Sequence, residues 1–488
     1  MKKIVRLLIA SMLAVSMTGN GLAASNSSED YELIGTADRI EFESGSEGEF
    51  IIVEDMTDIA EYEYEAVNFK FTEEYSPYVI GDDSIFIYGQ TIIEPGTEIQ
   101  FNGEGSLFVS DVVAEGTYDK PVTIIGNTDV DDVIGNFVIN EGNIASFKYC
   151  QIYNMQTAIM DIRDEFTKET SLVVDNCYFS DNWVSISGCA ECSEITNNTF
   201  NNNNINAIYL EDVSELGGTS KIYNCTFTSD TEGYGTIDIW SDKCEIFIDG
   251  CEFSGEYEAI NVEGIENKEV ANVQITNNLF DCCDTAIRLL RAYVNIVNNN
   301  FTKCSLAIYA NEDYNVALSA CNNVFNGNTS VIEVLDNRIN EVVGGYDLSY
   351  NCFVDGTDCV IYPEDDDAYN LILDGLREYD ELRGPVSKRV SVENDAVTVE
   401  LTKEVKNEYV HNVPMKAEVY LAVYDKETGE MLDIEKQELM VMKAARKLVF
   451  DLCDKEYELE DVDIKMFIWD GVEEMVPFEV IDNSVTPA

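Results

Sequence analysis

The sequence predicts an all-β chain in which a right-handed parallel β-helix is followed by a small immunoglobulin-like β-sandwich. Three observations support this prediction. A short phrase recurs every 21 to 28 residues, a column of isoleucines follows the phrase at a nearly constant distance, and the pattern changes to simple strand alternation near the C-terminus. Together they divide the 488 residues into a solenoid and a separate module.

The recurring phrase reads Asn-x-x-Phe, with Gly or Tyr in place of Asn in two copies. An aliphatic residue or Ala stands five residues before each Phe, and an Ile stands seven to ten residues after it. These spacings leave room for three short strands per repeat, which predicts a chain that winds once per repeat and stacks on itself. The phrases end at Phe179, Phe200, Phe227, Phe253, Phe280, Phe301, Phe325 and Phe353.

The Asn column has a physical reason in such a coil. Asn tolerates the left-handed backbone of a tight turn, and its amide can bond the same amide in the next coil. We therefore expect one Asn per coil to serve both purposes.

With these columns in place, the repeats resemble those of the pectate-lyase-like superfamily of parallel β-helices. The resemblance covers residues 78–360, and the segments 91–101 and 116–122 are similar to the first coils of secreted bacterial β-helix proteins. It implies the fold and leaves the activity open, because this fold hosts lyases, hydrolases, epimerases, adhesins and inert scaffolds.

The two ends of the chain differ from the repeats. Residues 1–23 read as a Sec signal peptide, with Lys2, Lys3 and Arg6 before an apolar run and small residues before the cleavage position. Residues 24–77 are expected to form an N-terminal cap. We therefore expect a secreted protein, extracellular or loosely associated with the cell surface.

After the repeats, residues 361–385 predict a helical cap and linker, with an amphipathic stretch closed by Gly384-Pro385. Residues 386–488 alternate as short strands, which predicts the sandwich. The segments 422–425 and 465–470 resemble a C-terminal module found on secreted proteins of clostridia-like bacteria.

The charge limits the partners. The chain holds 93 Asp and Glu against 30 Lys and Arg, a net charge of −63, so nucleic acid is excluded as a partner because phosphate binding needs basic surfaces. Acidic polymers are disfavoured unless calcium bridges the carboxylates, so no cofactor is required and calcium is the ion that the composition allows. No apolar stretch near 18 residues follows the signal peptide, so we expect no transmembrane segment in the mature chain. We also expect the protein to be a monomer.

The 14 cysteines are expected to be free thiols. Cys150 and Cys177, like Cys225 and Cys251, occupy one column on successive coils, and stacked strands hold their Cβ atoms farther apart than a disulfide prefers. Cys189-Ala190-Glu191-Cys192 has metal-ligand spacing, but it has no second pair and His411 is the only histidine. We therefore expect no metal site.

The outer face of the strand that carries the Ile column is the candidate site. If the isoleucines point inward, strand alternation turns the next residues outward. Aromatic rings for stacking and carboxylates for hydroxyl groups suit an extended sugar chain. Small residues such as Ala207 and Thr236, just before the Ile column, leave room for a groove. The two outward columns are Tyr209, Asp238, Asn261, Arg288, Tyr309 and Glu211, Trp240, Glu263, Leu290, Asn311.

Two functions and a purely structural role are the alternatives. The first is non-catalytic binding of extracellular glycans or partner surfaces through Tyr209, Glu211, Trp240, Asn261 and Tyr309. The second is a polysaccharide lyase or glycoside hydrolase. It would use Asp238, Glu263 and Arg288. Asp238 and Glu263 lie one coil and two residues apart, so the distance between their carboxyl groups falls within the range found in glycosidases. The alternative is a structural spacer without a ligand. A polygalacturonase is rejected, since its Gly-His-Gly motif is absent.

Overall fold

The computed structural model describes 316 residues, mostly strands and the turns between them. They are residues 50–56, 59, 66–126, 135–140, 142–163, 171–212, 217–229, 235–241, 243–264, 271–290, 292–311, 317–335, 346–347, 350–354, 361–362, 371–372, 386–393, 396–403, 415–441, 446–452, 455, 462–470, 476–477 and 480–482. The predicted signal peptide lies outside this part of the chain.

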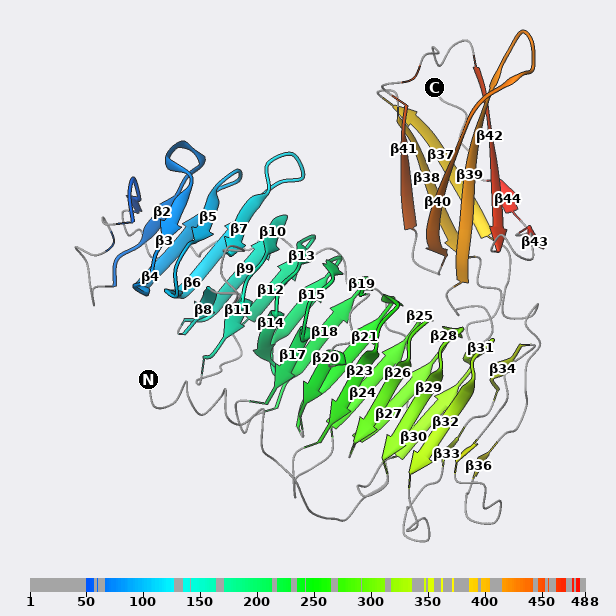
Figure 1. Ribbon diagram of the computed structural model, residues 1–488, viewed down its shortest axis with the longest axis horizontal. Helices are drawn as coiled ribbons and strands as arrows, with labels where there is room; N and C mark the ends of the chain where they lie inside the picture. Colours follow the sequence, from blue (N-terminus) through cyan, green and yellow to red (C-terminus); the bar gives the residue numbers. More distant parts are fainter. Residues whose placement is uncertain are drawn as a thin grey trace.

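The described residues between 50 and 372 form a parallel β-helix, which confirms the predicted fold class (Figure 1). One face is a sheet of 12 parallel strands, which contains the Phe of each phrase. Its strands are β3 (Tyr78–Ile80), β5 (Glu98–Phe101), β7 (Val122–Gly126), β10 (Cys150–Tyr153), β13 (Tyr178–Ser180), β16 (Thr199–Asn201), β19 (Thr226–Thr228), β22 (Glu252–Ser254), β25 (Leu279–Asp281), β28 (Asn300–Thr302), β31 (Val324–Asn326) and β34 (Cys352–Phe353).

The remaining strands of the β-helix belong to a 24-stranded parallel sheet, with two strands in most coils. The first strand of each coil carries the Ile column: β11 (Thr157–Asp161), β14 (Val184–Cys189), β17 (Asn206–Glu211), β20 (Gly235–Trp240), β23 (Glu258–Glu263), β26 (Thr285–Leu290), β29 (Leu306–Asn311), β32 (Ser330–Leu335) and β35 (Ile361–Tyr362). The second precedes the phrase: β12 (Ser171–Asp175), β15 (Ser193–Thr196), β18 (Thr219–Tyr223), β21 (Glu245–Asp249), β24 (Ala271–Thr276), β27 (Ala292–Val297), β30 (Ala317–Cys321), β33 (Tyr346–Asp347) and β36 (Leu371–Ile372).

The N-terminal coils use longer strands. β4 (Ile85–Ile93) pairs with β6 (Leu107–Glu115), and β6 pairs with both β8 (Asn136–Ile139) and β9 (Ile144–Lys148), so a single strand divides into two. β1 (Ile51–Ile52) pairs with β2 (Phe69–Phe71), which pairs with β4, and both pairings are parallel. Parallel pairing thus reaches into the segment expected to be a cap, while the cap boundary itself stays a prediction.

The Phe column forms a continuous stack inside the β-helix. Phe227 and Phe253 have ring centroids 4.7 Å apart and planes inclined by 4°, and the stack continues to Phe353 with spacings up to 5.4 Å. Phe253 is fully buried, as is Ile260 of the Ile column. Rings and isoleucines repeat because parallel coils place equivalent positions directly over one another.

The two roles expected of one Asn are divided between adjacent residues. Asn298 takes the left-handed backbone, with φ 58°, whereas its neighbour Asn299 is fully buried. Asn299 Oδ1 accepts from the backbone N–H of Asn278 at 2.8 Å, and Asn299 Nδ2 donates to Ile275 O at 2.8 Å. The ladder satisfies turn groups that burial would otherwise leave unpaired. It continues through Asn323 to Asn351.

The C-terminal part consists of two four-stranded sheets that are consistent with a β-sandwich (Figure 1). Its immunoglobulin-like topology stays a prediction. The first sheet contains β37 (Val386–Glu393), β38 (Ala396–Lys403), β41 (Arg446–Asp451) and β44 (Val480–Asp482). The second contains β39 (Met415–Asp425), β40 (Met431–Val441), β42 (Val462–Asp470) and β43 (Val476–Pro477). Of the stretch 361–385, expected to be a helical cap and linker, the structure describes Ile361–Tyr362 and Leu371–Ile372, which pair in parallel with β32 and β33 instead.

The 12 cysteines that the structure describes are free thiols, as the column argument predicts. Cys150 and Cys177 stack on successive coils, and the backbone N–H of Cys150 points to the sulfur of Cys177 at 3.4 Å. Both sulfurs also donate to backbone carbonyl groups. These thiols fill the position that Asn occupies in other coils.

Candidate functional site

The predicted outward columns are in register on the first strand of each coil. Tyr209 pairs with Asp238, Asp238 with Asn261, Asn261 with Arg288 and Arg288 with Tyr309. The second column, from Glu211 through Trp240 and Glu263 to Leu290 and Asn311, is paired in the same way. The side chain of Asn311 lies outside the described part. We call the surface formed by the two columns on β17, β20, β23, β26 and β29 the outer face.

Asp238 is the centre of the polar contacts on the outer face. Its Oδ1 accepts one hydrogen bond from Trp240 Nε1 at 3.0 Å and another from Asn261 Nδ2 at 2.8 Å. Burial raises the pKa of Asp238 to about 7, and the carboxylates of Glu263 and Glu258 act in the same direction, whereas the two hydrogen bonds oppose the shift. Asp238 can therefore exchange a proton near neutral pH.

Tyr209 and Trp240 supply the aromatic surface. Their ring centroids lie 6.5 Å apart with planes inclined by 47°, and both side chains are half-buried. Tyr209 OH donates to Glu211 Oε2 at 3.2 Å. Burial and the nearby Glu211 carboxylate raise the pKa of Tyr209, so its hydroxyl stays protonated. Two rings therefore stand beside two hydrogen-bonded carboxyl groups.

Arg288 is not directed at Asp238. Its NH1 lies 3.5 Å from Glu258 Oε2, and its guanidinium carbon lies 5.9 Å from the ring centre of Tyr309. Glu258 begins β23, next to a turn, where alternation gives no reliable direction for a side chain. Glu258 could therefore not be placed from the sequence.

Asn261 and Leu290 are more covered than an outward position suggests, since each is 7% exposed. The amide of Asn261 is occupied in holding Asp238, so Asn261 positions that carboxyl group rather than offering a free donor to solvent. Tyr209, Glu211, Asp238, Trp240, Glu263, Arg288 and Tyr309 are half-buried. The outer face is thus a closely packed surface with partly accessible side chains.

A shallow pocket lies beside the small residues, where a groove is expected. Ala207, Thr236, Glu256 and Tyr257 are among the residues that line it. Glu256 Oε2 accepts from the hydroxyl of Thr236, and burial raises the pKa of Glu256 to about 7. Glu256 lies in the turn before β23, so strand alternation could not place it.

Two groups of side chains bring possible metal ligands together near the turn between β14 and β15. Asp161, Cys189 and Cys192 form one group, and within it the ligand atoms all lie within 4.8 Å of one another. Glu191, Asp212 and Cys244 form the other, within the same limit. Only the Cys189 to Cys192 segment has ligand spacing along the sequence, because the remaining members come from other coils.

No helix in the described part of the chain is both long and apolar enough to cross a membrane. No family model and no curated protein matches the chain. Among solved structures, the chain is similar to the crystal structure of an alginate lyase from Paenibacillus sp. str. FPU-7, with 13% sequence identity and a TM-score of 0.25. That similarity covers 59% of this chain and 92% of the other, and at that TM-score it carries no argument about activity.

Proposed function

We propose that this is a secreted or cell-surface-associated β-helix protein that binds an extracellular glycan on the outer face without cleaving it. The observation that carries the proposal is the arrangement around Tyr209 and Trp240. Two rings lie 6.5 Å apart, and each belongs to a hydrogen-bonded pair with a carboxyl group. Aromatic rings stack on sugar faces and carboxyl groups accept from sugar hydroxyls, which gives an extended glycan both kinds of contact.

The charge favours a neutral glycan. Glu211, Asp238 and Glu263 share the outer face, and Arg288 is already close to Glu258. An acidic polymer would meet repulsion both from these carboxylates and from a chain of net charge −63. Calcium bridging would be needed for such a polymer to bind.

A second candidate function is cleavage of a polysaccharide, and the ionisation of Asp238 favours it. A carboxyl group with a pKa of about 7 can act as a general acid near neutral pH. Glu263, whose charge raises that pKa, would be the second carboxylate of a glycosidase, and Arg288 would serve a lyase. Both assignments keep the residues that the sequence predicts.

Retention on polysaccharides tests the binding proposal. The purified chain would be run through gels containing cellulose derivatives, xylan, galactan or pectate, each with and without calcium. We expect retarded migration on a neutral polymer, and Trp240→Ala should lose it while Tyr118→Ala, which removes a ring that is 89% exposed elsewhere on the β-helix, should not. Unchanged retention in Trp240→Ala would overturn the proposed site.

The same polymers separate binding from cleavage. New reducing ends or unsaturated products that disappear in Asp238→Asn would establish the enzyme. Retention without products in the wild-type chain would support the binder. If no polymer gives retention or products, the structural spacer is the remaining alternative.

A further inference from the structure

The turn between β14 and β15 brings two thiols together with a buried carboxylate from the preceding coil. Cys189 is fully buried and Cys192 is half-buried. Met160 pairs with Ser187, so Asp161, at the end of β11, lies beside the end of β14. The two sulfurs and a carboxylate oxygen of Asp161 lie within 4.8 Å of one another.

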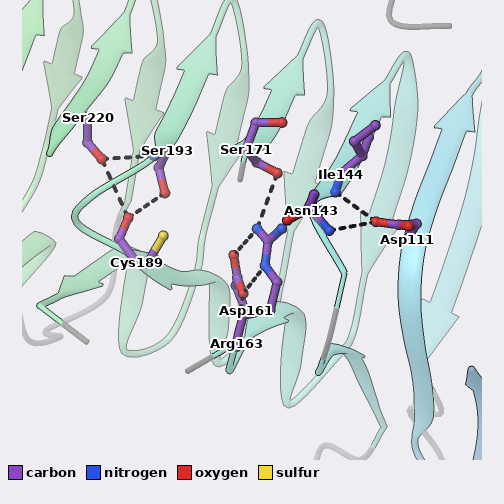
Figure 2. A network of polar contacts seen from close by, with 9 residues as sticks. All are labelled: Asp111, Asn143, Ile144, Asp161, Arg163, Ser171, Cys189, Ser193 and Ser220. Atoms are coloured by element: carbon purple, nitrogen blue, oxygen red, sulfur yellow. Dashed lines mark hydrogen bonds and ion pairs between the residues drawn. The ribbon is translucent and has the colours of Figure 1, made fainter. Parts of the chain in front are cut away.

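Arg163 fixes the carboxylate of this group (Figure 2). Its Nε donates to Asp161 Oδ1 at 2.8 Å and its NH2 donates to Oδ2 at 2.5 Å, while NH2 also reaches the backbone oxygen of Ser171 at 3.2 Å. Arg163 is 2% exposed and Asp161 is 6% exposed. A buried carboxylate held by two hydrogen bonds is oriented before any ion arrives, as the outer partners of metal ligands commonly achieve.

We propose that Cys189, Cys192 and Asp161 bind one zinc ion, with Arg163 as a positioning residue and water as the fourth ligand. The charges balance. Two thiolates and one carboxylate carry three negative charges, and Zn²⁺ with the Arg163 guanidinium carries three positive charges. Balanced charges of the ligands and Arg163 avoid the large cost of an uncompensated buried ion.

The geometry requires only a small closure. Zinc bonds of about 2.0 to 2.3 Å in a tetrahedral site place neighbouring ligand atoms about 3.3 to 3.8 Å apart. The three ligand atoms, already within 4.8 Å, would each move by about 1 Å or less. Cys192, in the turn that precedes β15, is the residue that can make this movement.

The other cysteines provide the contrast. Cys225 and Cys251 are stacked and buried, and their sulfurs point to backbone carbonyl oxygens, which leaves them as packing groups. The group of Glu191, Asp212 and Cys244 has a single thiol and two carboxylates, so it suits harder ions than zinc. Only the first group combines two thiols with one carboxylate among the described residues.

Cobalt is the probe for the test, because Co²⁺ in a thiolate site gives a charge-transfer absorption in the near ultraviolet. The full chain would be reduced, freed of metal and titrated with Co²⁺, then with Zn²⁺. We expect an absorption that saturates at about one equivalent and disappears when Zn²⁺ displaces the cobalt. Absence of this band in the fully reduced chain would overturn the proposal.

Variants locate the site. Cys192→Ser should weaken cobalt binding by about 10-fold or more and remove part of the band, whereas Cys282→Ser, at an exposed thiol on another coil, should change neither. Cys192→His should restore binding with a weaker band, which separates loss of a ligand from loss of the fold. Full binding in Cys192→Ser, or loss of binding in Cys244→Ser alone, would overturn the assignment.

Discussion

The inward and outward positions of β17, β20, β23 and β26 follow different rules. Ile208, Ile237, Ile260 and Ile287 repeat one residue along the inner face and are fully buried. The very next residues, Tyr209, Asp238, Asn261 and Arg288, form an outer column in which no residue repeats. Parallel stacking favours identical residues at inward positions, where the side chain serves only to pack the core. Variation on the outer face therefore indicates positions that packing does not determine.

The largest expected effect comes from breaking the inner stack. Phe253→Ala removes a buried ring that contacts Phe227 and Phe280 at 4.7 and 4.9 Å between centroids. We expect a loss of about 3 to 5 kcal/mol in the free energy of unfolding, measured by urea denaturation. Tyr118→Ala, at an exposed ring, should stay within about 0.5 kcal/mol. Equal effects of the two variants would contradict the contrast between inner and outer positions.

The Asn ladder should give the next largest effect. Asn299→Ala leaves the N–H of Asn278 and the carbonyl of Ile275 without their side-chain partner. We expect a loss of about 2 to 3 kcal/mol in the same urea measurement. The matched control is Asn272→Ala on the exposed side of β24, which should change the free energy of unfolding by less than about 0.5 kcal/mol. A negligible effect of Asn299→Ala would mean that the ladder does not stabilise the coils.

Asp238 should give the outer face a pH dependence of its own. Its folded pKa of about 7 lies above its ordinary value of 3.8, so the folded chain binds more protons than the unfolded chain between these pH values. The contribution of Asp238 to stability is therefore complete below about pH 4 and is lost as the pH rises through 7. Asp238→Asn should remove this part of the pH dependence from urea midpoints, whereas Asp284→Asn should not. Identical profiles for Asp238→Asn and wild type would contradict the raised pKa.

The smallest effect is expected from Arg288→Ala. The side chain of Arg288 is 35% exposed and its contact with Glu258 is 3.5 Å long, so the pair belongs to the weak surface class. We expect a change below about 1 kcal/mol in the free energy of unfolding. A loss comparable to that of Phe253→Ala would show that the outer face is part of the structural core.

Most of the β-helix could be predicted because its contacts repeat at fixed offsets. The Phe stack, the Ile column and the register of both outer columns all follow from coil length and strand alternation. Asn298 and Asn299 cannot be told apart in their own coil, since both positions hold Asn. The coil with Gly250 followed by Cys251 does carry the signal that the first position takes the left-handed backbone.

The residues of the candidate site that the sequence did not predict lie in or beside turns, where coil length and strand alternation do not set the direction of a side chain. Glu256 lies in a turn and Glu258 directly after one, so alternation does not set their direction. The ends of β11 and β14, with Asp161 and Cys189, lie side by side, but the sequence does not show that these side chains point toward one another and toward Cys192 in the turn. Contacts made by side chains in or beside turns are therefore not predicted by strand alternation.

The most direct test of the account compares binding and stability in one variant. Wild type and Trp240→Ala would be run in polysaccharide gels and denatured by urea side by side. We expect Trp240→Ala to lose retention on the neutral polymer while its unfolding midpoint falls far less than that of Phe253→Ala, since Trp240 lies on the outer face and is only half-buried. Retention equal to wild type would contradict the claim that the outer face binds the glycan.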